Sequence, residues 1–154
     1  MFVTDYIGRP MEIGKCDVCD VVQKRVLPAG GVVYRSDLAI VFHHLYAPIQ
    51  NFFVIAPIRH IMSDEELTHE ELEELSTLKQ KVHSFLEGDI REVPVRDSFE
   101  GHFKYWLIPD VEAFKNGIDC SIFTNKRAME RHEYPVAEPY DIMFRTVQLR
   151  NKLA

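Results

Sequence analysis

The feature that most constrains the fold is one long amphipathic helix, which we expect between residues 63 and 88, with strand-like segments on both sides of it. Ser63-Asp-Glu-Glu66 forms a capping box, in which the serine hydroxyl and the glutamate carboxylate satisfy early backbone N–H groups. A second capping box, Thr68-His-Glu-Glu71, is consistent with a short turn before the main helix. Apolar residues then recur at helical spacing as far as Gly88, at Leu67, Leu75, Leu78, Val82 and Phe85.

Segments rich in β-branched and aromatic residues lie on either side of this helix. Residues 31–35, 38–42 and 51–56 precede it, and residues 102–108 follow it. The three early segments are separated by short turn sequences, so we expect successive antiparallel strands. The order of strands, helix and strand predicts an α+β fold, in which a helix covers one face of an antiparallel sheet.

The chain reads as one domain with a C-terminal extension. We assign residues 1–109 to the domain and residues 110–154 to an extension packed on it. Within the extension, residues 110–116 predict a short helix, and residues 140–153 predict a closing helix.

Composition and charge restrict the classes of partner. The chain has 154 residues, of which 46% are hydrophobic and 27% charged, as in ordinary globular proteins. The net charge is −6, and residues 61–90 alone carry −7, from two basic and nine acidic side chains. The remainder is therefore close to neutral, which argues against a nucleic-acid partner or an anionic membrane surface.

No run of about 18 apolar residues is present, and the first 14 residues show no secretion signal. The chain contains three cysteines, two of them two residues apart, which fits a reducing compartment. We therefore expect a cytoplasmic protein.

The pair Cys16-Asp-Val-Cys19 has the spacing of half a tetrahedral zinc site. Neither a second Cys-x-x-Cys nor a close histidine pair follows, which excludes a zinc finger or ribbon. Further ligands would have to come from distant strands, and His60 and His102 are the candidates. Two partly buried thiols or a dithiol redox site remain as alternatives at this point.

Two further segments together resemble the histidine-triad family. The run from Val33 to Ser63 resembles the family's strands and the proline-basic-basic-His turn that leads into a capped helix, here Pro57-Ile-Arg-His60. After the helix the family carries His-φ-His-φ-His-φ-φ-Pro, with φ hydrophobic, and this chain has His102-Phe-Lys104-Tyr-Trp106-Leu-Ile-Pro109. The resemblance covers roughly residues 14–109 and implies a histidine-triad-like fold.

The departures from the family pattern concern its chemistry. In active members the middle histidine attacks the α-phosphate, and Lys104 stands at that position here. A lysine side chain with a pKa of about 10.4 is almost fully protonated at neutral pH, so it is better suited to binding phosphate than to acting as a nucleophile. Nucleotide-binding members of the family have a ribose-binding motif Phe-x-Asp, and this chain has Phe42-His43-His44 at that position. The resemblance thus gives Phe42, His44, Lys104 and Trp106 as ligand-binding positions.

The zinc-containing branch of this superfamily binds zinc through positions that this chain keeps. The resemblance implies a structural zinc ion held by Cys16, Cys19, His60 and His102, and it also implies a homodimer. A closed set of four ligands leaves no position for a reactive water molecule.

The leading hypothesis is a zinc-stabilised protein without the nucleophilic histidine, which binds a nucleotide or other phosphorylated ligand or has a regulatory role. The alternative is a nucleotidyl hydrolase or transferase that uses Lys104, or a histidine from elsewhere such as His44 or His132. A third hypothesis is a redox protein that uses Cys16 and Cys19. A pocket filled by Trp106 would instead leave a protein-binding surface.

Overall fold

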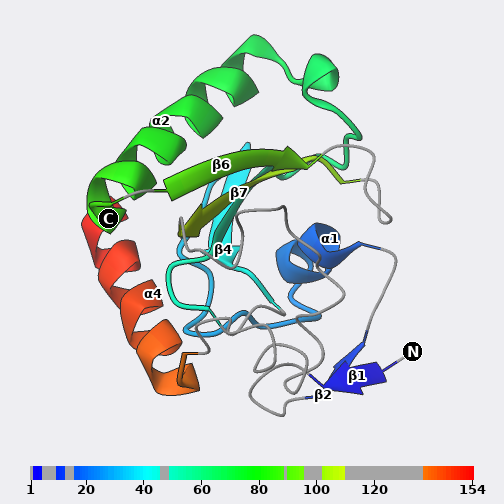
Figure 1. Cartoon of the computed structure of the whole chain (residues 1–154). Coiled ribbons are helices and arrows are strands. Elements are labelled where there is room, and N and C mark those ends of the chain that lie inside the picture. Colours follow the sequence, from blue (N-terminus) through cyan, green and yellow to red (C-terminus); the bar gives the residue numbers. More distant parts are fainter. Residues whose placement is uncertain are drawn as a thin grey trace.

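An antiparallel sheet lies at the centre of the molecule (Figure 1). It has five strands, in the order β3-β4-β5-β7-β6. The computed structural model describes residues 2–4, 10–12, 16–45, 49–88, 90–95, 102–109 and 137–154. The sheet strands are β3 Tyr34–Arg35, β4 Ala39–His43, β5 Phe53–Pro57, β6 Ile90–Val95 and β7 Lys104–Pro109. A separate pair, β1 Phe2–Thr4 and β2 Pro10–Glu12, lies near the N-terminus. The expected α+β class is confirmed.

The helix expected between residues 63 and 88 divides into two pieces. A 3-10 turn, η1 Asp64–Glu66, precedes the helix α2 His69–Leu86. Both expected capping boxes form, and the second one begins α2 because the Thr68 hydroxyl accepts the Glu71 N–H. Leu67 between the two pieces is extended, with ψ 137°. The helix ends at Glu87, which adopts the left-handed conformation with φ 45°.

Helices cover both faces of the sheet, whereas the sequence predicted cover on one face. Alternate residues of β4, β5 and β7 pack on α2 through Leu75, Leu78 and Val82. The other residues of these strands, including Phe42, Val54 and Trp106, pack towards the short helix α1 Asp17–Val22. Every residue of β4 and β5 is buried, which explains why these strands are apolar at every position except His43.

Four elements were not predicted from the sequence, and these are β1, β2, α1 and β6. The helix α1 has six residues, which is too short for helical periodicity to be visible. The strand β6 contains Arg91, Glu92 and Pro94, and among the described strands it pairs only with β7, at the edge of the sheet. Proline and charge are tolerated at such an edge because one side of the strand makes no ladder hydrogen bonds.

The expected closing helix is present as α4 Pro139–Leu153, with proline in its first turn. Its residues Ile142, Thr146 and Leu149 are buried. Thr146 lies against Gly30, where an added Cβ would be 2.8 Å from the Thr146 Cβ and where φ is +79°. This position therefore requires glycine.

The Arg150 guanidinium of α4 donates to the Val32 carbonyl at 2.9 Å and also to the Gly30 carbonyl. The expected helix at 110–116, Cys120 and His132 lie outside the described residues, so the division at residue 109 stays a prediction. None of the described helices combines the length and apolar character that crossing a membrane requires.

Candidate metal centre

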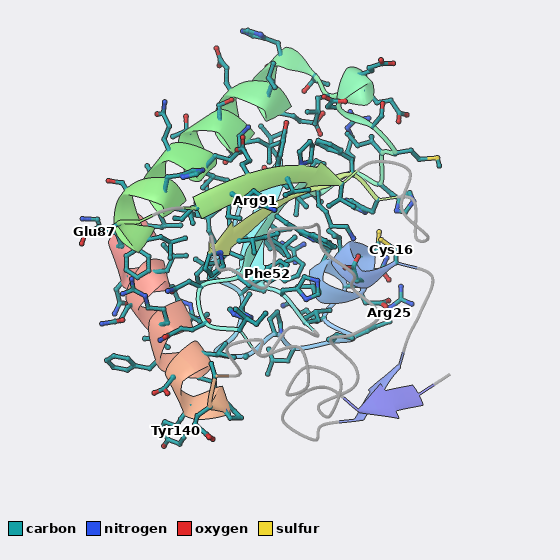
Figure 2. The ribbon with its side chains drawn as sticks, in the orientation of Figure 1. Cys16, Arg25, Phe52, Glu87, Arg91 and Tyr140 are labelled. Atoms are coloured by element: carbon teal, nitrogen blue, oxygen red, sulfur yellow. The ribbon has the colours of Figure 1, made fainter. Side chains whose placement is uncertain are left out.

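The Cys-x-x-Cys motif lies at the start of α1, where Figure 2 labels Cys16. Cys16 is the N-cap residue of the helix, and its Sγ accepts the backbone N–H of Cys19 at 3.3 Å. Three residues are slightly less than one helical turn, so both sulfur atoms project to the same side. Cys16 is buried, Cys19 is half-buried, and both are free thiols.

The turn that carries His60 is fastened to the N-terminus of α2. The Arg59 guanidinium donates to both carboxylate oxygens of Glu71, at 3.0 and 2.7 Å, and to the Glu66 carbonyl at 2.9 Å. Glu71 also accepts the Thr68 N–H, and the hydrogen bond from Arg59 lowers the pKa of this carboxyl group. The residue before His60 thus fixes the path of the turn.

His102 lies just before β7 and is fixed by backbone contacts with the same turn. Its ring Nε2 lies 2.9 Å from the Pro57 carbonyl, and the Phe103 N–H donates to the Ile61 carbonyl at 2.6 Å. A carbonyl can only accept, so the proton of a neutral His102 ring belongs on Nε2. The lone pair is then on Nδ1, which faces the cysteines, as in metal-binding histidines.

The four predicted ligand residues come together from three separate parts of the chain. His102 Nδ1 lies 3.2 Å from Cys16 Sγ, 3.5 Å from Cys19 Sγ and 3.2 Å from His60 Nδ1. Cys19 Sγ lies 3.4 Å from His60 Nδ1, and the ligand atoms of the four residues all lie within 4.8 Å of one another. Ligand atoms around a tetrahedral zinc ion are about 3.3–3.8 Å apart, from its usual bond lengths. The donor set and its spacing therefore fit a metal ion.

Burial keeps two of these groups uncharged in the absence of a metal. It raises the pKa of the Cys16 thiol to about 12, and it lowers the pKa of His102 to about 4. A neutral imidazole is ready to bind a cation. A neutral thiol must first lose its proton, so metal binding and proton release are coupled at Cys16.

Lys104 lies on the same side of the sheet as α1 and forms an ion pair there. Its Nζ is 2.7 Å from Asp17 Oδ1, and the exposed fractions of the two side chains are only 4% and 11%. Asp17 follows Cys16 directly and belongs to the first turn of α1. Lys104, for which the family resemblance implied the nucleophile position, is therefore held next to the candidate metal centre by a carboxylate.

Trp106 follows Lys104 on this face of the sheet and packs edge to face with two other rings. Its ring centroid is 5.3 Å from that of His44 and 5.6 Å from that of Phe52. Burial lowers the pKa of His44 to about 3. The Trp106 Nε1 atom is buried and has no hydrogen-bond partner in the described part of the chain. Phe42, a predicted ligand contact, is fully buried in the core on the α1 side.

Solved structures with a similar fold come from several organisms, although no family model and no curated protein match the sequence. A Zn-bound histidine triad family protein from Mycobacterium smegmatis is 13% identical, with a TM-score of 0.59 over 91% of this chain and 95% of the other. A Hit-like protein involved in cell-cycle regulation from Bartonella henselae is 14% identical, with a TM-score of 0.57 over 86% and 92% of the chains. A HIT family protein from Bacillus anthracis is 16% identical, with a TM-score of 0.53 over 61% and 72%.

The chain has the histidine-triad fold. This confirms the fold that the motif around residues 102–109 implied, and identities of 13–16% establish the fold alone. Within the histidine-triad fold, the residues missed from sequence are Asp17, Arg59 and Glu71. The sequence signal for Asp17 and Arg59 is adjacency, since Asp17 follows Cys16 and Arg59 precedes His60. Glu71 was identified in the sequence only as a member of the capping box that begins at Thr68.

Proposed function

We propose that this protein is a zinc-stabilised, non-catalytic protein with the histidine-triad fold, and that it binds a nucleotide or another phosphorylated small molecule. The non-catalytic part of this proposal rests on one observation. Lys104, which stands where the family has its nucleophile, is buried and paired with Asp17 at 2.7 Å.

A nucleophilic amine needs a free lone pair and access to the substrate. The Lys104 ammonium donates to the Asp17 carboxylate instead, and only 4% of its side chain is exposed. Attack on phosphorus would require this ion pair to break, which would leave the Asp17 carboxylate largely buried without its cation. This environment favours a binding protein over a nucleotidyl hydrolase or transferase.

The donor set at the candidate metal centre supports zinc. Two thiolates and two imidazoles form a typical four-ligand set for structural zinc, and a Zn-bound protein from Mycobacterium smegmatis shares the fold. When bound, the ion supplies cross-links between segments of the chain. Cys16 and Cys19 would hold α1, His60 the turn after β5, and His102 the segment before β7. Such a metal contributes to folding.

Trp106 supports the ligand-binding half of the proposal. Its buried Nε1–H has no acceptor among the described residues, and an unpaired buried donor is costly. A phosphate or sugar oxygen of a bound ligand would accept this hydrogen bond. Phe42 and His44 are buried, so we assign them the role of supporting the Trp106 side of the sheet.

Two further expectations accompany this function. We propose a homodimer, as the family resemblance implies. We also propose a cytoplasmic location, because the free thiols of Cys16 and Cys19 require a reducing environment to stay available to a metal.

Native mass spectrometry tests the metal. We expect one zinc ion per chain, and we expect Cys16→Ser to lose it. Cys120→Ser is the matched control, because it removes the one cysteine outside the Cys-x-x-Cys motif, and we expect it to keep the metal. Metal-free protein, with the masses of a Cys16–Cys19 disulfide, would instead establish the redox hypothesis.

Fluorescence of Trp106, the single tryptophan, tests ligand binding. We expect adenosine monophosphate to change the emission, with the Trp106→Phe variant binding at least tenfold more weakly by calorimetry. An unchanged calorimetric affinity in Trp106→Phe would refute its role. Hydrolysis of a dinucleoside polyphosphate that disappears in Lys104→Met would overturn the non-catalytic assignment.

A further inference from the structure

The buried ion pair of Lys104 and Asp17 lies in the same group of side chains as Trp106. Burial lowers the pKa of His44, whereas the charge of Asp17 raises it and that of Lys104 lowers it, so both charges lie close to this ring. The His44 ring in turn packs edge to face on Trp106, with the ring centroids 5.3 Å apart. Trp106 is only half-buried. A ligand that contacts Trp106 therefore comes close to the ion pair.

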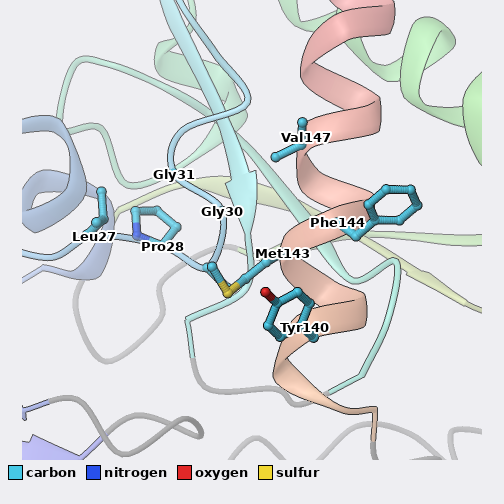
Figure 3. A pocket seen from close by; sticks show the side chains of 9 residues that line it. Leu27, Pro28, Gly30, Gly31, Tyr140, Met143, Phe144 and Val147 are labelled. Carbon is cyan, nitrogen blue, oxygen red and sulfur yellow. The ribbon is translucent and has the colours of Figure 1, made fainter.

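Grooves elsewhere on the described part of the chain do not suit a phosphate. One groove of about 500 Å³ lies between α4 and the loop of residues 27–31, and none of the described residues that line it is charged (Figure 3). Its α4 side is formed by exposed apolar residues, which are Tyr140, Met143, Phe144 and Val147. Two other grooves, beside α2, are lined by more acidic than basic side chains. These comparisons favour Lys104 as the cation that a phosphate would seek.

The Asp17 carboxylate already occupies the position of an anion next to Lys104. Its Oδ1 atom accepts the Lys104 ammonium at 2.7 Å and also the Val18 N–H of its own helix at 2.7 Å. The ion pair has no net charge, so the carboxylate cancels much of the attraction that the ammonium would exert on a second anion. Because only 4% of the Lys104 side chain is exposed, a phosphate reaches the ammonium only where the carboxylate gives way.

We propose that Asp17 is a specificity-determining residue, an internal anion that competes with the phosphate of the ligand for Lys104. A phosphomonoester carries a charge of about −1.5 to −2 at pH 7, and the Asp17 carboxylate repels it. A phosphodiester carries a single negative charge and is repelled less. The site therefore prefers a ligand with a phosphodiester to one with a terminal phosphomonoester.

This inference rests on the proposed function, to which it adds a preference for the charge of the ligand. The test is calorimetry of the zinc-loaded full chain with adenosine, adenosine monophosphate and the methyl ester of adenosine monophosphate. We expect the wild-type chain to bind the methyl ester at least threefold more tightly than the monophosphate.

Asp17→Asn removes the charge but keeps an oxygen that can accept the Val18 N–H. It leaves the buried Lys104 ammonium without its anion, which a phosphate then supplies. We expect the affinity for the monophosphate to rise at least tenfold, that for the methyl ester to rise less, and that for adenosine to stay within twofold. A purely structural role of Asp17 would change all three affinities alike, and this result would overturn the proposal.

Asp37→Asn is the matched control, because it changes the net charge equally at an exposed position between β3 and β4. We expect it to bind all three compounds as the wild type does. Asp17→Ser is the second variant if Asp17→Asn does not fold, with the same expected result. Ligand binding without a gain for the monophosphate over adenosine would overturn the competition and leave the proposed function standing. A wild-type chain and Asp17 variants that bind none of the three compounds would overturn both.

Discussion

The Nζ atom of Lys104 lies 2.7 Å from Asp17 Oδ1, and this buried ion pair joins β7 to the helix that carries Cys16 and Cys19. The two charges thus connect two of the three segments that build the candidate metal centre. Removing one charge from such a pair leaves the other buried, which costs far more than a pair at the surface.

Lys104→Met should lower the free energy of unfolding by about 2–4 kcal/mol, because it leaves the Asp17 carboxylate without its cation. Adding Asp17→Asn should restore part of this loss. Urea unfolding of the zinc-loaded single and double variants gives the coupling energy. Lys152→Met, on the exposed last turn of α4, is the control and should change stability by less than about 0.5 kcal/mol. Strictly additive effects would mean that the ion pair makes no contribution.

Zinc affinity should rise with pH. Burial raises the pKa of the Cys16 thiol from 9.0 to about 12, so the metal must displace its proton. Each proton released increases the apparent affinity about tenfold per pH unit between about pH 6 and 8. Competition with a chromophoric chelator at several pH values measures this slope. A flat profile would show that Cys16 binds no metal or is already ionised.

Acidification should destabilise the protein partly through His44. Burial lowers the pKa of this imidazole from 6.5 to about 3, so the unfolded chain binds its proton at higher pH than the folded chain does. Stability is therefore lost as the pH falls below 6.5, by about 1.4 kcal/mol per pH unit. His44→Phe should reduce this slope, measured by thermal unfolding from pH 7 to about pH 4.

Glu71→Gln should loosen the turn that carries His60. The substitution removes the negative charge of the carboxylate that accepts hydrogen bonds from the Arg59 guanidinium at 2.7 and 3.0 Å. We expect the free energy of unfolding to fall by about 1–3 kcal/mol. Zinc affinity should also fall, by about tenfold, because Arg59 positions the neighbouring ligand. Glu73→Gln alters an exposed carboxylate of the same helix and is the matched control. Zinc affinity equal to that of the control would contradict a positioning role for Glu71.

The sequence anticipated the fold class and most of the sheet because local patterns are strong there. Capping boxes at Ser63 and Thr68 and apolar spacing locate α2, and apolar runs locate β4 and β5. The edge strand β6 was missed because Pro94 and charged residues conceal its strand character. The cover of a second sheet face by α1 was also missed, because six residues show no periodicity.

The candidate metal residues were identified from the spacing of Cys16 and Cys19 and from the family resemblance. Their proximity to His60 and His102 depends on contacts between distant segments, such as the hydrogen bond between the His102 ring and the Pro57 carbonyl. No local pattern specifies that hydrogen bond.

By itself the sequence determined which side chains share a face of β7, because strands alternate, and so placed Lys104 and Trp106 on the same side as His102. Only the tertiary structure decided what these side chains meet. It set Asp17 against Lys104, left the Trp106 N–H without a partner in the described chain, and turned a second apolar stripe of α4 outward. The physical reason is that charge pairing, hydrogen bonding and burial depend on residues far apart in sequence, which come together only when the layers pack.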